Sequence, residues 1–335
     1  MKNVLLLNLG SPKSLKTKDV RDYLNEFLSD DNVIDLPKFF QQLILRCFIL
    51  PFRPAQAKEA YEQIWDKKGS PLILNTQKIS DALSFKTGWN VKIAMRYQFP
   101  SIKQAIEEFK KDQVDEIQVL SLYPHYAMST TLSTALEVKR VVKEIYPNLK
   151  LNFIEPFYNH PEYIKALSKS IKPYLHKFDK LIFSYHGIPM RHIRKSDISG
   201  THCNGNKSCC SIDNESSHKC YRANCYNTSK MTAEYLNLSA NDWMMTFQSR
   251  VSIISADWLK PYTDIELEKL AKKEIKRVGV VCPSFIADCL ETLEEINIRG
   301  REDFEKAGGS SFTYISCLND NKNFINVLEK IISDN

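Results

Sequence analysis

Short apolar runs alternate with amphipathic segments from one end of this chain to the other, and no other feature restricts its fold as much. The apolar runs predict strands at residues 4–9, 91–97, 116–122, 149–154, 180–185, 244–248, 277–281 and 312–317. The amphipathic segments predict helices at about residues 18–29, 55–66, 75–86, 101–112, 130–146, 161–176, 227–238, 286–297 and 321–333. This order is typical of parallel sheets covered by helices on both faces. The sequence therefore predicts an α/β fold.

The chain of 335 residues is long enough for more than one domain, because a single hydrophobic core rarely grows beyond about 250–300 residues. Pro156 ends a predicted strand near the middle of the chain, so we place a domain boundary between residues 155 and 156. The hydrophobic content of 43% and the charged content of 26% are ordinary for a globular enzyme.

One predicted strand ends in a residue that can do chemistry. The apolar run at residues 181–185 stops at His186 and is then broken by Gly187 and Pro189. In open α/β sheets, ligands bind at the carboxyl ends of the strands, and a histidine there can take a proton or bind a metal near neutral pH. A second apolar run, residues 278–282, ends in the same way before a proline.

An acidic segment follows that second run. A predicted helix that opens at Ser284 carries acids at positions i, i+3 and i+7, namely Asp288, Glu291 and Glu295, and this spacing places them on one face. One interpretation is a solvated first turn, since the helix dipole favours carboxylates there. The other is a metal site, because stacked like charges repel one another unless a cation is present. Fe²⁺ would relieve the repulsion, with the nitrogen of His186 opposite it.

These two segments resemble the two signature motifs of ferrochelatases, which insert Fe²⁺ into protoporphyrin IX to make protohaem. The first motif runs from Ser184 to Pro189 and the second from Cys282 to Ile296. Further motifs of that family follow in the same order: Leu7 to Pro12, Gly69 to Leu72, Met95 to Tyr97, Leu122 to Tyr126 with Ser129 to Thr131, and Met244 to Arg250 with Pro261 to Asp264. The resemblance implies a lyase that catalyses the terminal step of haem biosynthesis and releases two protons.

The resemblance also implies an architecture of two similar Rossmann-like domains of the chelatase type, with the active-site cleft between them. In that family the C-terminal helix packs back on the first domain. Residues 1–155 and 312–335 would then form the N-terminal domain, and residues 156–311 the second. The second domain would carry the catalytic residues and a cysteine-rich insertion at about residues 200–226.

By the same resemblance, His186 and Glu291 are the catalytic pair. An ordinary histidine has a pKa of about 6.5, so His186 is suited either to accept a pyrrole proton or to bind the substrate Fe²⁺. Glu291 and Glu295 would also bind that metal, and would move metal or protons outward along the helix. Arg299 stands where the family has a further acid, so this chain departs from the pattern of an outer metal site.

Porphyrin-binding residues are expected where three predicted strands end. They are Leu9, Gly10, Ser11, Arg96, Tyr97 and Tyr123. Gly10 would allow a close backbone approach, and Arg96 could pair with a propionate. The ring of Tyr97 could contact the macrocycle. Each residue alone could equally be a core or capping residue, and their shared position at strand ends favours a ligand.

Five of the nine cysteines lie in one polar segment: Cys203, Cys209, Cys210, Cys220 and Cys225. Disulfides are disfavoured in a cytosolic chain, so a metal centre is the expectation. Four thiolates suit Zn²⁺ or an iron–sulfur cluster, and free or redox-active thiols are a third interpretation. The segment lacks the paired Cys-x2-Cys spacing that is usual for zinc. Some bacterial ferrochelatases that this chain resembles hold a [2Fe-2S] cluster in such an insertion, which implies four of these five cysteines as ligands.

The predicted first strand begins at Val4, which leaves no room for a signal peptide and predicts a cytoplasmic protein. No window approaches the ~20 apolar residues that span a bilayer. An apolar segment at about residues 36–53 could be an ordinary core helix or could lie in a membrane interface. The resemblance implies a lip over the porphyrin, with peripheral contact at the inner membrane as one interpretation. The net charge of +6 suits anionic partners such as porphyrin propionates, and no basic cluster indicates nucleic acid.

Two other functions remain open from the sequence. One is a chelatase for coproporphyrin or another tetrapyrrole. A chelatase that loads cobalt or nickel into a reduced tetrapyrrole belongs to this class, but it would predict a histidine pair in the metal site. The other is an iron–sulfur redox or iron sensor with a porphyrin-binding cleft. The completeness of the ferrochelatase motifs favours protoporphyrin IX and Fe²⁺ as the partners.

Overall fold

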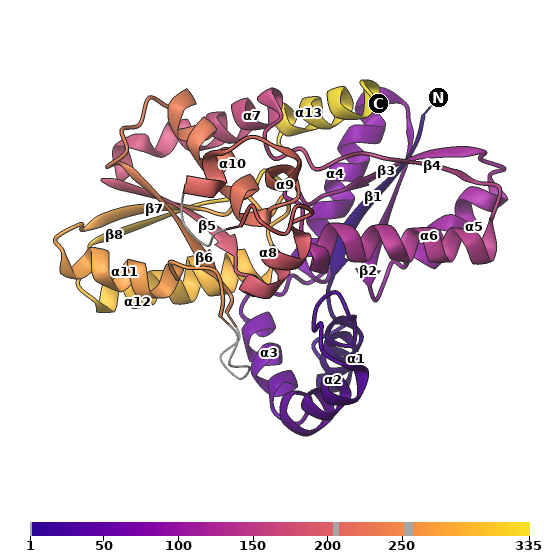
Figure 1. Ribbon diagram of the computed structural model, residues 1–335, viewed down its shortest axis with the longest axis horizontal. Helices are drawn as coiled ribbons and strands as arrows, with labels where there is room; N and C mark the ends of the chain where they lie inside the picture. Colours follow the sequence, from indigo (N-terminus) through magenta and orange to yellow (C-terminus); the bar gives the residue numbers. More distant parts are fainter. Residues whose placement is uncertain (1, 204–207, 251–256) are drawn as a thin grey trace. The chain divides into compact units, whose positions relative to one another are not determined.

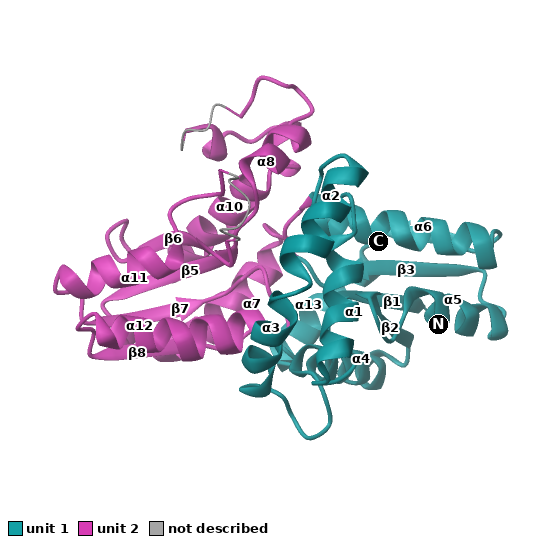
Figure 2. Ribbon diagram, turned by 90° about the horizontal axis from the view of Figure 1, so that it is seen from below, with its two compact units in different colours: residues 1–123, 128–156, 319–335 teal, residues 124–127, 157–318 magenta. Residues whose placement is uncertain are grey.

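The computed structural model describes residues 2–203, 208–250 and 257–335 (Figure 1). The chain divides into two compact units (Figure 2). Unit 1 comprises Met1–Tyr123, Met128–Pro156 and Asn319–Asn335, and unit 2 comprises Pro124–Ala127 and Phe157–Leu318. Each unit contains a four-stranded sheet in which all neighbouring strands are parallel. The predicted fold class of two parallel sheets flanked by helices is confirmed.

The sheet of unit 1 has the strand order β2-β1-β3-β4. Its strands are β1 (Asn3–Gly10), β2 (Asn90–Tyr97), β3 (Glu116–Ser121) and β4 (Lys150–Phe153). The helices are α1 (Thr17–Leu28), α2 (Lys38–Ile44), η1 (Leu45–Ile49), α3 (Arg53–Glu62), α4 (Pro71–Thr87), α5 (Ile102–Lys111), η2 (Met128–Leu132), α6 (Ser133–Ile145) and α13 (Lys322–Ser333). Leu5 and Leu7 of β1 point to one face, where they pack in one cluster with residues of α5 and α6. On the other face, Asn8 donates a hydrogen bond to Thr76 of α4.

The sheet of unit 2 has the strand order β6-β5-β7-β8. Its strands are β5 (Lys180–His186), β6 (Trp243–Gln248), β7 (Arg277–Val281) and β8 (Ser311–Ile315). The helices are α7 (Pro161–Ile171), η3 (Lys172–Lys177), α8 (Met190–Ser196), η4 (Ser208–Ser211), α9 (Glu215–His218), α10 (Tyr221–Tyr235), α11 (Thr263–Lys272), η5 (Glu291–Gly300) and α12 (Arg301–Lys306). Ile182 of β5 packs with Leu267 of α11 and Phe304 of α12. Tyr185 points the other way and bonds Ser229 of α10.

The chain returns to unit 1 later than the sequence predicts. β8 pairs with β7 along its whole length, so residues 312–318 belong to unit 2 and the return occurs at Asn319. The expected return at residue 312 is therefore wrong, because the last apolar run completes the second sheet. The helix that follows, α13, packs on α4, where Lys86 and Glu329 form an ion pair of 2.5 Å.

The acidic segment differs most from its predicted structure. The expected α-helix from Ser284 is absent there. The helical structure is instead a π-helix, η5, over Glu291–Gly300. Residues 283–287 form turns and bends, and the amide of Cys289 bonds the Thr292 hydroxyl at 3.0 Å. In a π-helix each amide reaches five residues back rather than four, so the spacing rules of an α-helix do not hold. Short π-helical segments are frequent at functional sites.

Candidate active site

The six residues expected to bind porphyrin lie at one edge of the unit 1 sheet, where β1, β2 and β3 end. Gly10, the last residue of β1, pairs with Tyr97, the last residue of β2. Its φ is 114°, and a Cβ atom at this position would lie 2.0 Å from the Tyr97 carbonyl oxygen. Glycine is therefore required here, because the two strand ends approach more closely than any side chain permits. We call this edge the unit 1 rim.

Polar groups with few partners face this rim. Ser11 is buried, and its hydroxyl has no hydrogen-bond partner among the residues that the structure describes. A buried polar atom is almost always paired, so such a group is a natural donor for a bound ligand. Tyr123 is also buried at the end of β3, and burial raises the pKa of its phenol, which is therefore neutral. Leu9 remains partly exposed beside them.

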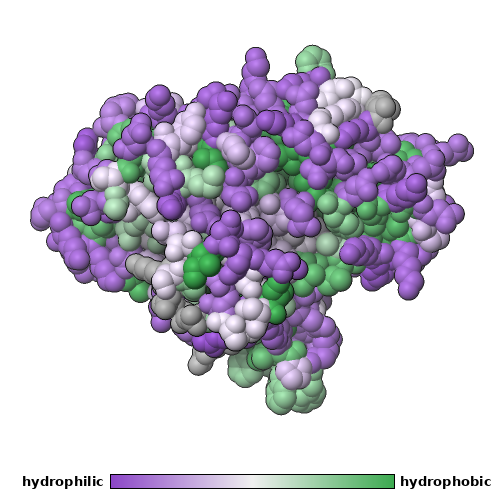
Figure 3. Space-filling view, turned by 45° about the horizontal axis from the view of Figure 1, so that its top comes forward, coloured by the Kyte–Doolittle hydropathy of each residue, from purple (hydrophilic) through white to green (hydrophobic). Residues whose placement is uncertain are grey.

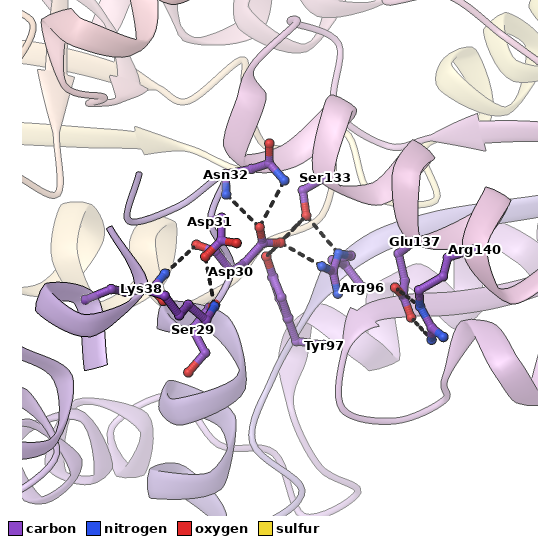
Figure 4. Close-up of polar contacts among 11 residues, drawn as sticks. Ser29, Asp30, Asp31, Asn32, Lys38, Arg96, Tyr97, Ser133, Glu137 and Arg140 are labelled. Atoms are coloured by element: carbon purple, nitrogen blue, oxygen red, sulfur yellow. Dashed lines mark hydrogen bonds and ion pairs between the residues drawn. The ribbon is translucent and has the colours of Figure 1, made fainter. Parts of the chain in front are cut away.

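Arg96 and Tyr97 are held by a carboxylate that the sequence analysis did not single out. Asp30, just after α1, accepts hydrogen bonds from the Arg96 guanidinium at 2.6 Å and from the Tyr97 hydroxyl at 2.9 Å (Figure 4). It also accepts hydrogen bonds from the Ser133 hydroxyl and from the amide of Asn32. We call these five residues the Asp30 cluster. Asp30 lies in an Asp-Asp-Asn turn sequence, which gives no signal that one of its acids is buried.

In unit 2, His186 is the last residue of β5, as predicted. Its ring nitrogen Nδ1 lies 2.7 Å from the Gly187 carbonyl oxygen, and Tyr221 donates a hydrogen bond of 2.9 Å to the His186 carbonyl. In a neutral imidazole, an Nδ1–H that donates to Gly187 leaves Nε2 as the nitrogen with a free lone pair. The Gly187 backbone itself is tightly packed, since a Cβ there would lie 2.8 Å from the Gln248 carbonyl oxygen.

Glu291 and Glu295 both lie on η5 and are tied to the end of β6. Gln248 donates a 2.7 Å hydrogen bond to the carbonyl of Glu291, and the amide of Ser249 donates one of 2.8 Å to the Glu295 carboxylate. The Ser249 hydroxyl bonds the same carboxylate. Ser249 has a φ of 62°, a left-handed conformation that is uncommon outside glycine and often marks functional sites. Gln248 and Ser249 lie within the family motif Met244 to Arg250, but no role was predicted for them.

Electrostatic interactions link Glu295 to its neighbours. Burial raises the pKa of the Glu295 carboxyl, against the lowering effects of the Ser249 hydrogen bonds, of the positive charge of Arg299, and of the charge that His186 carries when its ring is protonated. The side chains of His186 and Glu295 are therefore close enough to interact. We call the edge that carries His186, Glu291 and Glu295 the unit 2 rim.

Asp288 lies outside the helix that carries the two glutamates, so the three acids do not form the predicted helical face. It lies before η5 and is buried. Its carboxylate accepts hydrogen bonds from the Tyr314 hydroxyl and from the Cys317 amide, the latter at 3.3 Å. It is thus engaged with the end of β8. Arg299 pairs instead with Glu294 at 3.2 Å.

The five clustered cysteines lie close together in unit 2. All but Cys203 are buried. Burial raises the pKa of Cys210 to about 12 and that of Cys220 to about 11, with added contributions from the neighbouring thiols Cys203 and Cys209. Cys225 lies within α10. In the described parts of the chain, no three His, Cys, Asp or Glu side chains are arranged to hold a metal ion. The predicted insertion includes residues 204–207, which lie outside the described residues.

The segment α2–η1–α3 of unit 1 exposes large apolar side chains. They are Phe39, Phe40, Leu43, Phe48 and Phe52, with exposed fractions between 44% and 73%. We call them the apolar lip. Hydrophobic side chains gather at the lower tip of the space-filling view, where this segment projects (Figure 3). Among the described residues, no helix is long and apolar enough to cross a membrane.

The whole chain, residues 1–335, matches the ferrochelatase family model. A ferrochelatase of Opitutus terrae is 43% identical over 329 residues, which cover 97% of this chain and 95% of that protein. A ferrochelatase of Porphyromonas gingivalis is 41% identical over 334 residues, with 99% and 95% covered. These matches confirm the resemblance that the motifs indicate.

Solved structures resemble the chain in fold alone. SirB from Bacillus subtilis with Fe³⁺ superposes with a TM-score of 0.53 at 13% identity, covering 78% of this chain and 90% of SirB. CbiX, described as the terminal enzyme of sirohaem biosynthesis in denitrifying bacteria, gives a TM-score of 0.50 at 11% identity, with 99% of each chain covered. The fold of parallel sheets flanked by helices is therefore shared with these two proteins.

Proposed function

The chain belongs to the ferrochelatase family, and we propose that it performs the reaction of that family with the residues of its two rims. The reaction inserts Fe²⁺ into protoporphyrin IX, releases two protons and forms protohaem, so the protein is a lyase of the metal–porphyrin chelatase class. The observation that carries the assignment of roles is His186 at the end of β5, next to strand β6, after which the Ser249 amide bonds Glu295 of the π-helix η5.

His186 is the group that receives a pyrrole proton. Its Nδ1 is occupied by the Gly187 carbonyl, so Nε2 is the nitrogen that can accept a proton or contact the incoming Fe²⁺. Glu291 is the second catalytic residue and binds the substrate metal together with Glu295. Because Glu295 is buried enough to raise its pKa, it can take up and release a proton more readily near neutral pH than an ordinary glutamate.

The unit 1 rim binds the porphyrin. Leu9 supplies apolar contact and the unpaired hydroxyl of Ser11 supplies a hydrogen-bond donor. Gly10 lets the β1 and β2 ends meet without a side chain between them. Arg96 offers Nη1 to a propionate, since its Nε and Nη2 already bond Ser133 and Asp30. The rings of Tyr97 and Tyr123 line the same edge.

Histidine substitution tests the catalytic assignment. We expect His186→Ala to lose iron insertion by at least ~100-fold while it still binds protoporphyrin, because general acid–base groups contribute about 10²–10⁴-fold. His176→Ala is the matched control, since His176 lies in η3, at the opposite end of the strands from His186. Insertion by His186→Ala at the rate of the control would contradict the role of His186.

We propose that four of the five clustered thiols, Cys203, Cys209, Cys210, Cys220 and Cys225, hold a [2Fe-2S] cluster. The burial of all of them except Cys203, and the electrostatic effects of neighbouring thiols on Cys210 and Cys220, support a shared site. Burial raises the pKa of Cys210 and of Cys220, and a thiol must lose its proton when it binds a metal, so cluster assembly would release protons. The bound cluster would supply a structural or redox-sensing centre, and no step of metal insertion depends on it.

Spectroscopy of the purified holoprotein tests this centre. We expect visible absorption bands, iron and acid-labile sulfide in equal amounts, and an electron paramagnetic resonance signal after reduction. Cys220→Ser should lose all three, whereas Cys47→Ser, which replaces an exposed thiol of η1, should keep them. If the analysis instead finds stoichiometric zinc and no sulfide, the thiols hold a zinc ion and the cluster proposal is wrong.

We further propose that the apolar lip contacts the surface of the cytoplasmic membrane. Five exposed apolar side chains within α2–η1–α3 support this, and Lys38, Arg46 and Arg53 within or beside them suit anionic headgroups. The contact would be peripheral. The protein would remain cytoplasmic, and the lip would touch the lipid layer, in which protoporphyrin dissolves.

A further inference from the structure

The Asp30 cluster places a buried ion pair at the unit 1 rim. The Asp30 side chain is 5% exposed and the Arg96 side chain 15%, and the two charged groups are 2.6 Å apart. Ser133 bridges them, because its hydroxyl bonds Asp30 and accepts a 2.8 Å hydrogen bond from Arg96 Nε. The Arg96 guanidinium also stacks over the ring of Tyr97, 4.5 Å from the centroid. The cluster therefore fixes Arg96 in one orientation.

Asp30 is charged at neutral pH. Burial alone would raise the pKa of its carboxyl, but the hydrogen bonds from Ser133 and Asn32 and the charge of Arg96 lower it below the ordinary value. The positive charge of Arg96 is therefore cancelled by a carboxylate in direct contact. One edge of the guanidinium, Nη1, has no partner among the described residues. The rim thus presents an N–H donor without net charge.

We propose that Asp30 is a specificity-determining residue, which neutralises Arg96 so that the unit 1 rim favours a porphyrin with two carboxylates over one with four. The inference rests on the proposed function, because it needs a porphyrin at this rim. Protoporphyrin carries two carboxylates and coproporphyrin carries four. An uncompensated arginine attracts both, but it attracts the more highly charged ligand more strongly.

Asp30→Asn tests the proposal, since the amide keeps the shape of the side chain and removes its charge. Asp31→Asn is the matched control, because the neighbouring Asp31 is 69% exposed and pairs with Lys38 outside the cluster. The quantity to compare is the ratio of affinities for coproporphyrin and protoporphyrin, measured by fluorescence titration, and the same ratio in kcat/KM. We expect the ratio to rise about tenfold in Asp30→Asn and to stay unchanged in Asp31→Asn. The rise should shrink as salt is added.

Arg96→Gln provides the opposite perturbation. It leaves Asp30 as a lone negative charge, so the coproporphyrin ratio should fall several-fold, and Asp30→Asn combined with Arg96→Gln should return it to that of the wild type. If Asp30→Asn does not fold, the proposal is tested by the expected decrease of the coproporphyrin-to-protoporphyrin ratio in Arg96→Gln. A loss of affinity that is equal for both porphyrins would show that Asp30 acts only on structure and would overturn the proposal.

The binding ratios separate this inference from the proposed function. A wild-type protein that binds both porphyrins but metallates neither would contradict the proposed function, while the ratios would still test Asp30. A wild-type protein that metallates protoporphyrin, with identical ratios in Asp30→Asn and Asp31→Asn, would overturn the role of Asp30 alone. A protein that binds no porphyrin would overturn both.

Discussion

Gly10→Ala should disturb the unit 1 rim more than the replacement of any other glycine of that unit by alanine. The φ of Gly10 is 114°, and a non-glycine residue in such a region costs about 1–3 kcal/mol. The new Cβ would also lie 2.0 Å from the Tyr97 carbonyl oxygen, so the ends of β1 and β2 must move apart, which adds about 1–3 kcal/mol. The total of about 2–6 kcal/mol lies within the stability of an ordinary domain.

Gly69→Ala separates the two contributions. Gly69 has a φ of 130°, but nothing lies within 4 Å of the position of its Cβ. Urea unfolding of both variants should therefore show Gly10→Ala to be less stable by about 1–3 kcal/mol. Displacement of Tyr97 and Arg96 should also weaken protoporphyrin binding only in Gly10→Ala, as measured by fluorescence titration. Equal stability and equal porphyrin affinity in the two variants would refute the reasoning.

Three further predictions follow from the rims and the lip. Ser249→Ala removes a hydrogen bond that lowers the pKa of Glu295, so this pKa should rise further, and the pH profile of kcat/KM should move upward; an unmoved profile would contradict the contact. The lowered pKa of Asp30 stabilises the folded state above the ordinary pKa of a carboxyl group, and this contribution is lost as the pH falls through the folded value. The stability difference between wild type and Asp30→Asn should accordingly be full at neutral pH and should shrink below about pH 4 in acid unfolding curves; a difference that is constant with pH would exclude an ionised Asp30. Replacing Phe39 and Phe40 by serine should reduce co-sedimentation with anionic vesicles without changing porphyrin turnover in detergent. Undiminished binding to the vesicles would show that the apolar lip does not contact the membrane.

The strands could be predicted from sequence because each is a short segment rich in apolar residues and separated from the next by a turn or a helix. His186 was found for the same reason, since an apolar strand that stops at histidine before Gly187 leaves little choice of position. The boundary at residue 312 could not be found, because a strand of the second sheet looks the same as one that returns to the first. Only its pairing with β7 assigns it.

The details of the candidate site depend on contacts between distant residues. The π-helix was missed because its apolar spacing fits an α-helix, whereas Thr292, Asp288 and the end of β8 delay its start. Asp30 was missed because its partners Arg96 and Ser133 lie 66 and 103 residues away. Helix α11 was not predicted because many of its residues are charged, although Leu267 and Ala271 on one face are buried.

The most direct test of the central claim is anaerobic addition of Fe²⁺ to the purified protein with protoporphyrin IX in weak buffer, with porphyrin fluorescence, haem absorption and pH recorded together. The proposed reaction predicts that fluorescence disappears, that a protohaem spectrum replaces it, and that two protons are released for each porphyrin consumed. Bound porphyrin that stays fluorescent and metal-free, with no protons released, would contradict it.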